Sequence, residues 1–235
     1  MRRKIISLLV FTLCFVSPIK VSSQEAYAIL EGSTLTFKYG TKPNVNDTWN
    51  IPKPGDTSIP GWISKCFNIT KVVFDATFSY ARPQTCRWWF VNCENLTQIE
   101  NMRNLNTSET TDMYQMFYNC NKLESIDLNN FATYNSRNLC GMFSHCENLI
   151  SLDLSTFNTI YAEDISDMFS SCTNLSNIKF GDLFNTAKIT DMSGMFASCS
   201  NLKRLDLSKF KTSKVESMNS MFRDCISLHS IELSS

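Results

Sequence analysis

The stretch MFSHCENLISLDLSTFNT, residues 142–159, decides the fold of this 235-residue chain, because its pattern recurs along much of the sequence. It returns as MFASCSNLKRLDLSKFKT at residues 195–212. The cysteine of the motif stands at Cys93, Cys120, Cys146, Cys172, Cys199 and Cys225, which are 27, 26, 26, 27 and 26 residues apart. Self-similarity at a fixed period of this length indicates a repeat solenoid, in which neighbouring units share one core.

Each unit combines two periodicities. Residues 152–154, Leu-Asp-Leu, alternate between apolar and polar side chains, as expected of a strand with one buried face. Residues 113–120 carry apolar side chains at i, i+3, i+4 and i+7, which predicts a short helix with one apolar face. Candidate N-caps are Asp112, Asn138, Asp164, Asp191 and Ser217, and candidate left-handed helix ends are Asn95, Asn148, Asn174 and Asn201.

These patterns predict an α/β repeat solenoid over residues 69–235: a right-handed, leucine-rich-repeat-like stack with one parallel sheet of about seven strands plus short helices. Residues 24–68 lack the repeat pattern and differ in composition. Segments 26–30 and 34–39 flank a Glu-Gly-Ser turn and predict a β-hairpin, and a proline-rich stretch follows. We expect this region to cap the apolar N-terminal end of the stack, since about 45 residues hold little core for a separate ligand-binding module.

Residues 1–23 predict a secretory signal peptide, because basic residues 2–4 precede an apolar run over residues 5–16. Such a run is short for a membrane span, which needs about 20 residues. Cleavage near Ser23 would remove four basic residues and leave 18 against 22 acidic ones, a net charge of −4. We therefore expect a secreted or cell-surface protein with no membrane span after cleavage and no nucleic-acid partner.

Nine of the ten cysteines would remain after cleavage, and no C-x-x-C pair occurs, so neither a metal site nor a cofactor is predicted. Stacking would place the motif cysteines in a buried row, where we expect reduced thiols acting as small apolar fillers. A Cys66 bridge within the cap stays open, and Cys140 is expected to be more exposed. Cys140 and His145, five apart on a helix, would point to different faces, so no nucleophile–base pair is predicted.

The unit M-F-x-x-C-x-x-L-x-x-L-D-L-S-x-F-x-T resembles the repeat of BspA-type leucine-rich-repeat surface proteins of bacteria. Residues 69–75 and 88–90 also resemble the entry segment of that family, so the likeness covers roughly residues 24–235. The resemblance implies a secreted or surface-displayed solenoid without catalytic residues, in some members implicated in adhesion to host matrix proteins or other bacteria. The last unit stops after its strand, which leads us to expect a truncated product or an open C-terminal end that associates with a partner.

The outward positions of the strands are the first choice for a ligand-binding surface, since repeat proteins bind through extended, regular faces. With their neighbours these candidates are Ser125, Asp127, Asn129, Ser151, Asp153, Ser155, Lys179, Arg204, Asp206, Ser208 and Glu232. Parallel pairing would place Asp127 beside Asp153, a like-charge pair that could attract calcium. A solvated face is favoured over a calcium site, because calcium usually takes more oxygen ligands than two carboxylates supply.

The sequence thus favours a non-enzymatic protein that binds a macromolecular ligand, either a protein or a cell surface. One alternative is a structural or remnant repeat segment without a ligand of its own. A secreted hydrolase is the more distant alternative, because no nucleophile, acid pair or metal set converges in the sequence.

Overall fold

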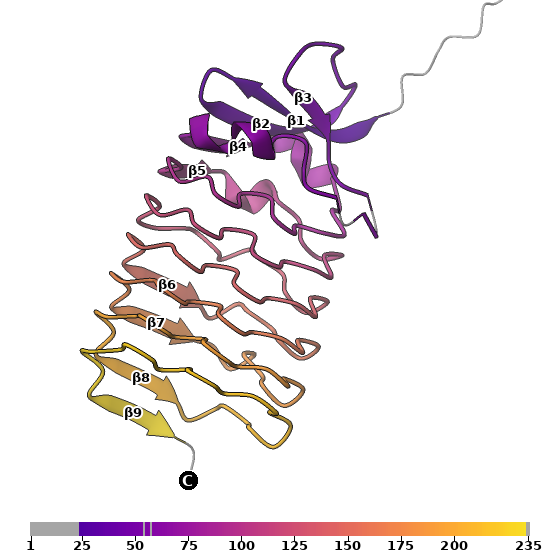
Figure 1. Cartoon of the computed structure of the whole chain (residues 1–235). Coiled ribbons are helices and arrows are strands. Elements are labelled where there is room, and N and C mark those ends of the chain that lie inside the picture. The colour runs from indigo at the N-terminus through magenta and orange to yellow at the C-terminus, as the bar shows by residue number, and fades with distance from the viewer. Residues whose placement is uncertain (1–23, 54, 57, 234–235) are drawn as a thin grey trace, which may run out of the picture.

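The computed structural model describes residues 24–53, 55–56 and 58–233. They form an elongated stack of coils, with a hairpin at the N-terminal end and the last strand at the other (Figure 1). The predicted signal peptide lies outside the described residues. In the part of the chain that the structure describes, no helix has the length and apolar character needed to cross a membrane.

The N-terminal end of the stack is a five-stranded sheet with strand order β3-β1-β2-β4-β5. Strands β1 (Glu25–Glu31) and β2 (Thr34–Gly40) form the predicted hairpin. Strand β3 (Thr48–Asn50) pairs antiparallel with β1, whereas β2 pairs in parallel with β4 (Lys71–Phe74), and β4 with β5 (Gln98–Glu100). The hairpin is therefore the first layer of the solenoid's own sheet.

Aromatic side chains join the hairpin to the first repeats. The ring of Phe37 in β2 stacks on Phe74 and Trp89, with centroid separations of 4.9 and 5.0 Å. The indole N–H of the buried Trp62 donates to the carbonyl oxygen of Trp89 at 2.6 Å, so its one polar group is satisfied. The apolar end of the stack is covered by these contacts.

A disulfide crosses the same junction. Cys66, in the 3-10 helix η1 (Ile63–Asn68), is bonded to Cys93. The expectation of a reduced thiol at Cys93 is therefore wrong. Cys66 stands 27 residues before Cys93, which is one repeat length, so it occupies the position of the motif cysteine one layer earlier.

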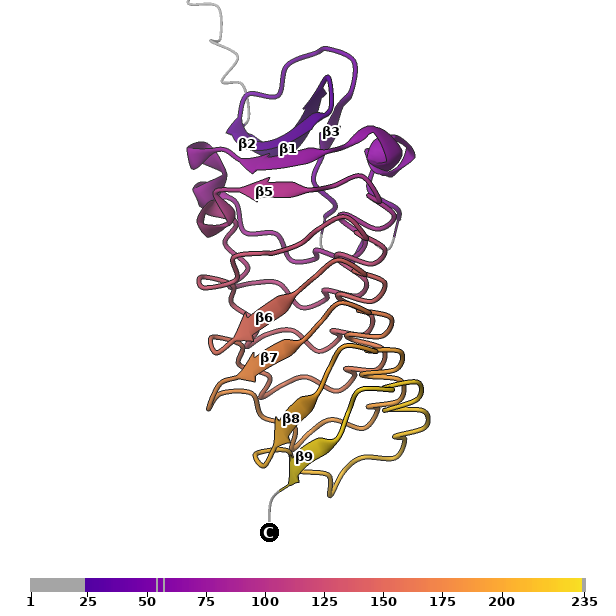
Figure 2. The same cartoon turned by 90° about the vertical axis from the view of Figure 1, so that its left-hand side faces the viewer.

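Further along the stack the sheet is interrupted. Strand β6 (Ser151–Leu154) pairs in parallel with β7 (Asn177–Phe180), and β8 (Arg204–Leu207) pairs with β9 (Ser230–Leu233). No ladder joins β7 to β8, and residues 125–128 form no strand. The prediction of one continuous parallel sheet is therefore wrong, although the strands still follow one side of the stack (Figure 2).

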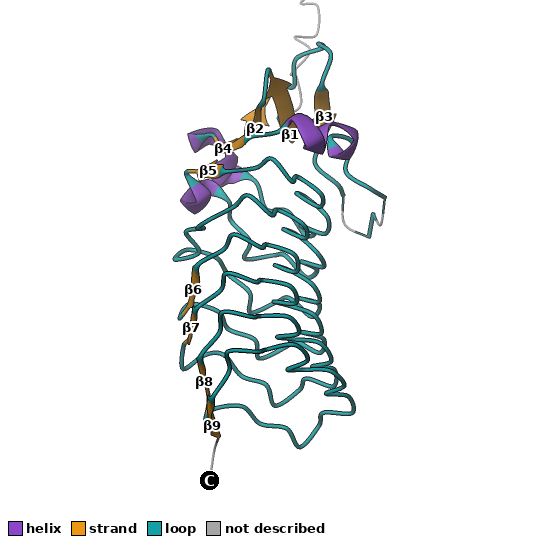
Figure 3. Ribbon diagram, turned by 60° about the vertical axis from the view of Figure 1, so that its left-hand side comes forward, coloured by secondary structure: helices purple, strands orange, loops and turns teal. Residues whose placement is uncertain are grey.

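The short helices predicted for the repeats are also absent from the described residues, where turns take their place. Helical structure there is limited to the 3-10 helices η1, η2 (Ala76–Tyr80) and η3 (Met102–Asn104), all near the N-terminal end (Figure 3). The repeats are therefore coils of strand and turns.

The backbone of residues 113–120 shows why no helix forms. The N–H groups of Met116 and Cys120 donate to carbonyls three residues earlier, both at 3.2 Å. Those of Gln115, Phe117 and Asn119 instead donate to carbonyls of the next repeat, at 2.8 to 2.9 Å. Gln115 and Asn119 adopt φ angles of 51° and 59°, in the left-handed region that a right-handed helix excludes. The predicted side chains are buried as expected, but in two successive turns.

The predicted cap residues form turns as well. In Asp112, Asn138, Asp164 and Asp191 the side-chain oxygen accepts the N–H group two residues further on, at 2.7 to 2.9 Å. The asparagines predicted to be left-handed are not, because the left-handed residues lie three positions earlier. Asn148, Asn174 and Asn201 instead form an amide ladder on the surface, with N···O distances of 3.1 and 3.2 Å.

Two buried ladders hold successive turns together. Phe117, Phe143 and Phe169 stack nearly parallel, with centroid separations of 5.6 and 6.1 Å. The motif cysteines after Cys93 are free thiols, and each S–H donates to a phenylalanine carbonyl of the preceding repeat. Burial raises the pKa of the Cys146 thiol to about 12, so this thiol stays protonated at neutral pH.

Candidate functional site

The strands and the turns that follow them form one face of the stack, called here the sheet face. Its central candidate residues Asp127, Asp153, Lys179, Asp206 and Glu232 are all exposed. Ser155 and Ser208 are half-buried, so they present less surface than predicted. The rest of the predicted set, Ser125, Asn129, Ser151 and Arg204, is exposed.

Among the described strands, the registers on this face place acidic residues opposite each other in one ladder only, where Asp206 of β8 faces Glu232 of β9. Asp153 lies opposite Lys179 in the β6–β7 ladder, and their side chains form an ion pair at 3.2 Å. Asp127 is in no strand, and its carboxylate accepts the backbone N–H of Asn129 at 3.1 Å. The pairing of Asp153 with a lysine weakens the case for a calcium site, and no group of three metal-ligating side chains occurs among the described residues.

Two of the acidic residues also shape the turns after their strands. Asp153 and Asp206 each accept the N–H group two residues further on, both at 2.9 Å. Hydrogen bonds from Ser155 and Ser208 lower the pKa of the respective carboxyls, assisted by the lysines nearby. Both groups therefore stay ionised well into the acidic range and combine a local structural role with a surface charge.

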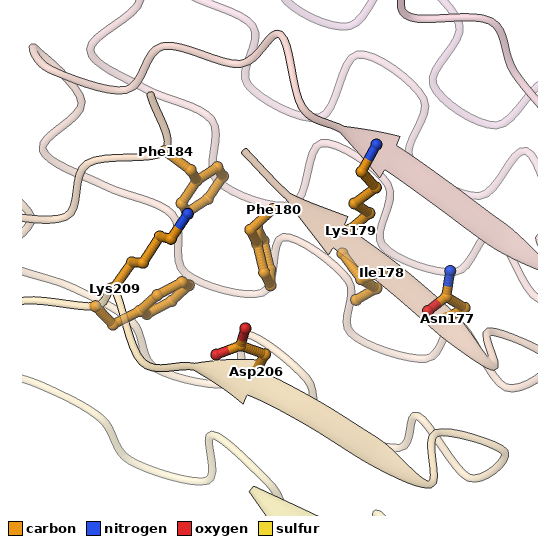
Figure 4. A pocket seen from close by; sticks show the side chains of 8 residues that line it. Asn177, Ile178, Lys179, Phe180, Phe184, Asp206 and Lys209 are labelled. Atoms are coloured by element: carbon orange, nitrogen blue, oxygen red, sulfur yellow. The ribbon is translucent and has the colours of Figure 1, made fainter. Parts of the chain in front are cut away.

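A notch opens on the sheet face between β7 and β8, where the sheet is interrupted. It is a cavity of about 240 Å³ with Lys179, Asp206 and Lys209 among the residues that line it (Figure 4). The apolar part of its lining is Ile178, Phe180, Phe184 and Phe210. The sequence-predicted site residues include Lys179 and Asp206 of this notch but none of its apolar lining.

Three phenylalanine rings form a cluster in the notch. Phe180 lies 4.6 Å from Phe184 and 5.2 Å from Phe210, measured between centroids, and Phe184 stacks on Phe210 at 5.5 Å. Phe184 and Phe210 are buried, whereas Phe180 is only half-buried. At this point of the sheet face a partner could reach an aromatic surface.

The turn after β7 is one residue longer than the turn after β6, but the same length after β4 does not prevent β4 from pairing with β5. Four positions separate Phe180 from Phe184, whereas three separate Leu154 from Phe157 in the preceding unit. Gly181 occupies the longer turn, and any side chain there would collide with the backbone of Ser155. The extra residue was visible in the sequence, but the loss of pairing between β7 and β8 was not, and for this reason Phe180, Phe184, Lys209 and Phe210 were missed.

Both lysines at the notch are engaged in ion pairs. Lys179 pairs with Asp153, and Lys209 pairs with Asp182 in the longer turn. These pairs are solvent-exposed and contribute little to stability, so either lysine can exchange its partner at small cost.

Cys140 and His145 line a second cavity, of about 280 Å³, on the side of the stack formed by the turns; it is called here the turn-face pocket. The prediction that they point to different faces is wrong, because their segment is not a helix. Burial nevertheless raises the pKa of the Cys140 thiol to about 11, and the Ser166 hydroxyl donates to its sulfur at 3.1 Å. A protonated thiol does not serve as a nucleophile at neutral pH.

Comparison with solved structures identifies the architecture. A leucine-rich repeat protein from Bacteroides ovatus aligns with a TM-score of 0.53 and 16% identity, over 89% of this chain and 52% of that protein. This likeness shows a leucine-rich-repeat fold, and the chain spans about half the length of that protein. A leucine-rich repeat protein from Eubacterium ventriosum aligns with a TM-score of only 0.22 and 13% identity, over 91% of this chain and 84% of that protein.

No curated protein matches the sequence. The family described as "Mycoplasma protein of unknown function, DUF285" matches residues 84–181 and 176–235, which together span residues 84–235. Since these matches cover more than half of the chain, the protein belongs to the DUF285 family.

Proposed function

We propose that this protein is a non-catalytic binding protein that holds a protein partner on its sheet face, with the notch as the anchoring point. The observation that carries the proposal is the half-buried Phe180, packed on two buried phenylalanines in a notch with charged side chains around it. Binding energy concentrates where an apolar anchor enters such a recess and the surrounding polar contacts exclude water. The leucine-rich-repeat fold supports this role, because repeat proteins recognise partners through extended faces.

The proposed setting is the outside of the cell. The basic and apolar pattern of residues 1–23 supports export, and the resemblance to BspA-type surface proteins supports adhesion to host matrix proteins or to other cells. The partner would then be a protein exposed on a matrix or on a cell surface.

The test is solid-phase binding of the purified protein to a panel of immobilised matrix proteins and whole bacterial cells. Phe180→Ala should weaken any specific binding roughly tenfold, because loss of a central aromatic anchor commonly costs more than about 1 kcal/mol. Reversing the charges at the rim with Lys179→Glu and Lys209→Glu should also weaken it. A matched control is Lys211→Glu with Lys214→Glu, which makes the same change of net charge at exposed residues outside the notch lining.

Two results would contradict the proposal. One is specific binding that the control variant weakens as much as the rim variant does, which would indicate a general effect of charge. The other is the absence of specific binding to any member of the panel, which would favour a structural segment without a ligand of its own.

A further inference from the structure

The turns of successive repeats form a second regular surface, separate from the sheet face. Equivalent positions of the repeats lie side by side there, as shown by the bridges Asp112↔Asn138, Asn138↔Asp164 and Asp164↔Asp191. Arg87, Tyr114, Cys140 and Ser166 occupy one column of this surface, each two positions after its bridge residue. Equivalent positions of successive repeats therefore carry side chains of different chemical types on this surface.

The first layers show how this surface holds a cation. The guanidinium carbon of Arg87 lies 4.2 Å from the ring centroid of Trp88 and 4.1 Å from that of Tyr114. The same guanidinium forms an ion pair with Asp112 in the next repeat, at 3.2 Å. Aromatic faces and a carboxylate are the two features that stabilise a planar cation at a protein surface.

The next positions of this column, Cys140 and Ser166, carry no basic side chain. The turn-face pocket is lined by the rings of Tyr114, Tyr118 and His145 together with the carboxylate of Asp167. The rest of the lining includes Gly141 and Ser170, and the side chain of Gln115 lies over Gly141. At about 280 Å³ the pocket is below the roughly 300–1,000 Å³ typical of sites for drug-sized ligands, and its size suits a single side chain.

Asp167 is the carboxylate that lines the pocket, and Asp164 and Asp191 lie near it outside the lining. Among the ion pairs of the described residues, none involves Asp164, Asp167 or Asp191. Burial, together with Asp191 and Asp164, raises the pKa of the Asp167 carboxyl, an effect that Arg223 and His145 only partly oppose. The side chain of Asp167 lies over Gly194, where a Cβ atom would collide with its carboxylate, so the glycine leaves room for the acid at this place.

We propose that the turn-face pocket binds an arginine side chain of a partner protein, with the guanidinium beside Asp167 and against the tyrosine rings. Arginine is favoured over lysine because the internal example, Arg87, is a guanidinium stacked on Tyr114. A planar cation can lie on a ring and face a carboxylate at once, whereas an ammonium is a compact, strongly hydrated charge. This contact would be independent of the notch, which lies on the other side of the stack.

The test uses a short fluorescein-labelled peptide, Ser-Gly-Arg-Gly-Ser, and two relatives in which citrulline or lysine replaces the arginine. Citrulline keeps the planar shape and lacks the charge. Binding at low ionic strength is followed in the ¹⁵N-labelled protein by NMR, with the amide signals of Gly141, Ser144 and Ser170 as reporters of the pocket. We expect the arginine peptide to shift these signals, the citrulline peptide to leave them unchanged and the lysine peptide to bind more weakly.

Two variants sharpen the test. Asp167→Asn keeps the shape of the side chain and should weaken arginine binding by ~5-fold, which corresponds to about 1 kcal/mol. The matched control, Asp127→Asn, makes the same change on the sheet face and keeps a side-chain acceptor for the Asn129 N–H, so it should have no effect. Cys140→Arg places a guanidinium in the column of Arg87, beside Asp164, and should prevent peptide binding by filling the pocket.

The proposal is overturned if the citrulline peptide shifts the same signals as strongly as the arginine peptide, or if Asp167→Asn leaves the affinity unchanged. Lysine binding equal to arginine binding would contradict the assignment to a guanidinium. Shifts confined to residues outside the pocket would show that the peptide binds elsewhere.

Discussion

Replacement of Phe143 by alanine should destabilise the middle of the stack by about 3–5 kcal/mol, the usual cost of removing a buried phenylalanine. Phe143 is fully buried, and its ring lies nearly parallel to those of Phe117 and Phe169, at 5.6 and 6.1 Å. Loss of the ring leaves a cavity between two repeats and removes two stacking contacts, each worth ~0.5–1.5 kcal/mol beyond burial. Phe143→Leu keeps most of the apolar volume and should cost much less.

Urea unfolding followed by two probes measures this effect. The four tryptophans, Trp49, Trp62, Trp88 and Trp89, all lie in the N-terminal part of the chain, so their fluorescence reports on the cap and the first repeats. Far-UV circular dichroism reports on the whole stack. If the shared core couples neighbouring repeats, Phe143→Ala should lower the transition midpoint seen by both probes. A loss below about 1 kcal/mol, or an equal loss in Phe143→Leu, would refute the assignment of Phe143 to a continuous stacked core.

Three further predictions concern other parts of the structure. Peptide mapping without reduction should recover Cys66 linked to Cys93, and recovery of Cys93 as a free thiol would contradict the bridge. In the native protein Cys140 should be alkylated before the fully buried Cys146, at a rate that rises towards pH 11. Gly194→Ala should lower the melting temperature, because the residue has a φ of 62° and a Cβ atom would meet the Asp167 carboxylate; an unchanged melting temperature would contradict this packing. Asp167→Asn should raise the stability at pH 7, because the folded state raises the pKa of this carboxyl and so disfavours its ionised form. The gain in stability should fade as the pH falls through that raised pKa and vanish below the ordinary value of 3.8. A gain that grows on acidification would contradict the raised pKa.

The spacing of the repeat was sufficient to predict which side chains are buried. Met116, Phe117 and Cys120 are fully buried as expected, because the period of the motif fixes which residues meet in successive layers. The element that carries them was predicted wrongly, since two successive turns bury the same positions as a two-turn helix. A signal against a helix was present in Gly141 and Gly194, which share the column of the left-handed Gln115.

The bridge and the notch differ in how far the sequence could reveal them. Cys66 stands one repeat length before Cys93, so its place on the cysteine row could have been recognised from spacing alone. The notch could not, because it depends on the loss of pairing between β7 and β8, and the same longer turn after β4 leaves the pairing of β4 with β5 intact. The sheet-face candidates were found by their alternation with buried residues, whereas Phe180 occupies an inward position of its strand and is only half-buried, at the place where the sheet is interrupted.

The most direct test of sheet-face binding is hydrogen–deuterium exchange of the protein with and without a partner identified in the binding panel. If the notch anchors the partner, protection should appear in residues 177–184 and 204–210, which contain its lining, and Phe180→Ala should reduce that protection. Protection confined to the turns of residues 113–120 and 139–146, with no change across β7 and β8, would contradict the assignment of the sheet face as the binding surface.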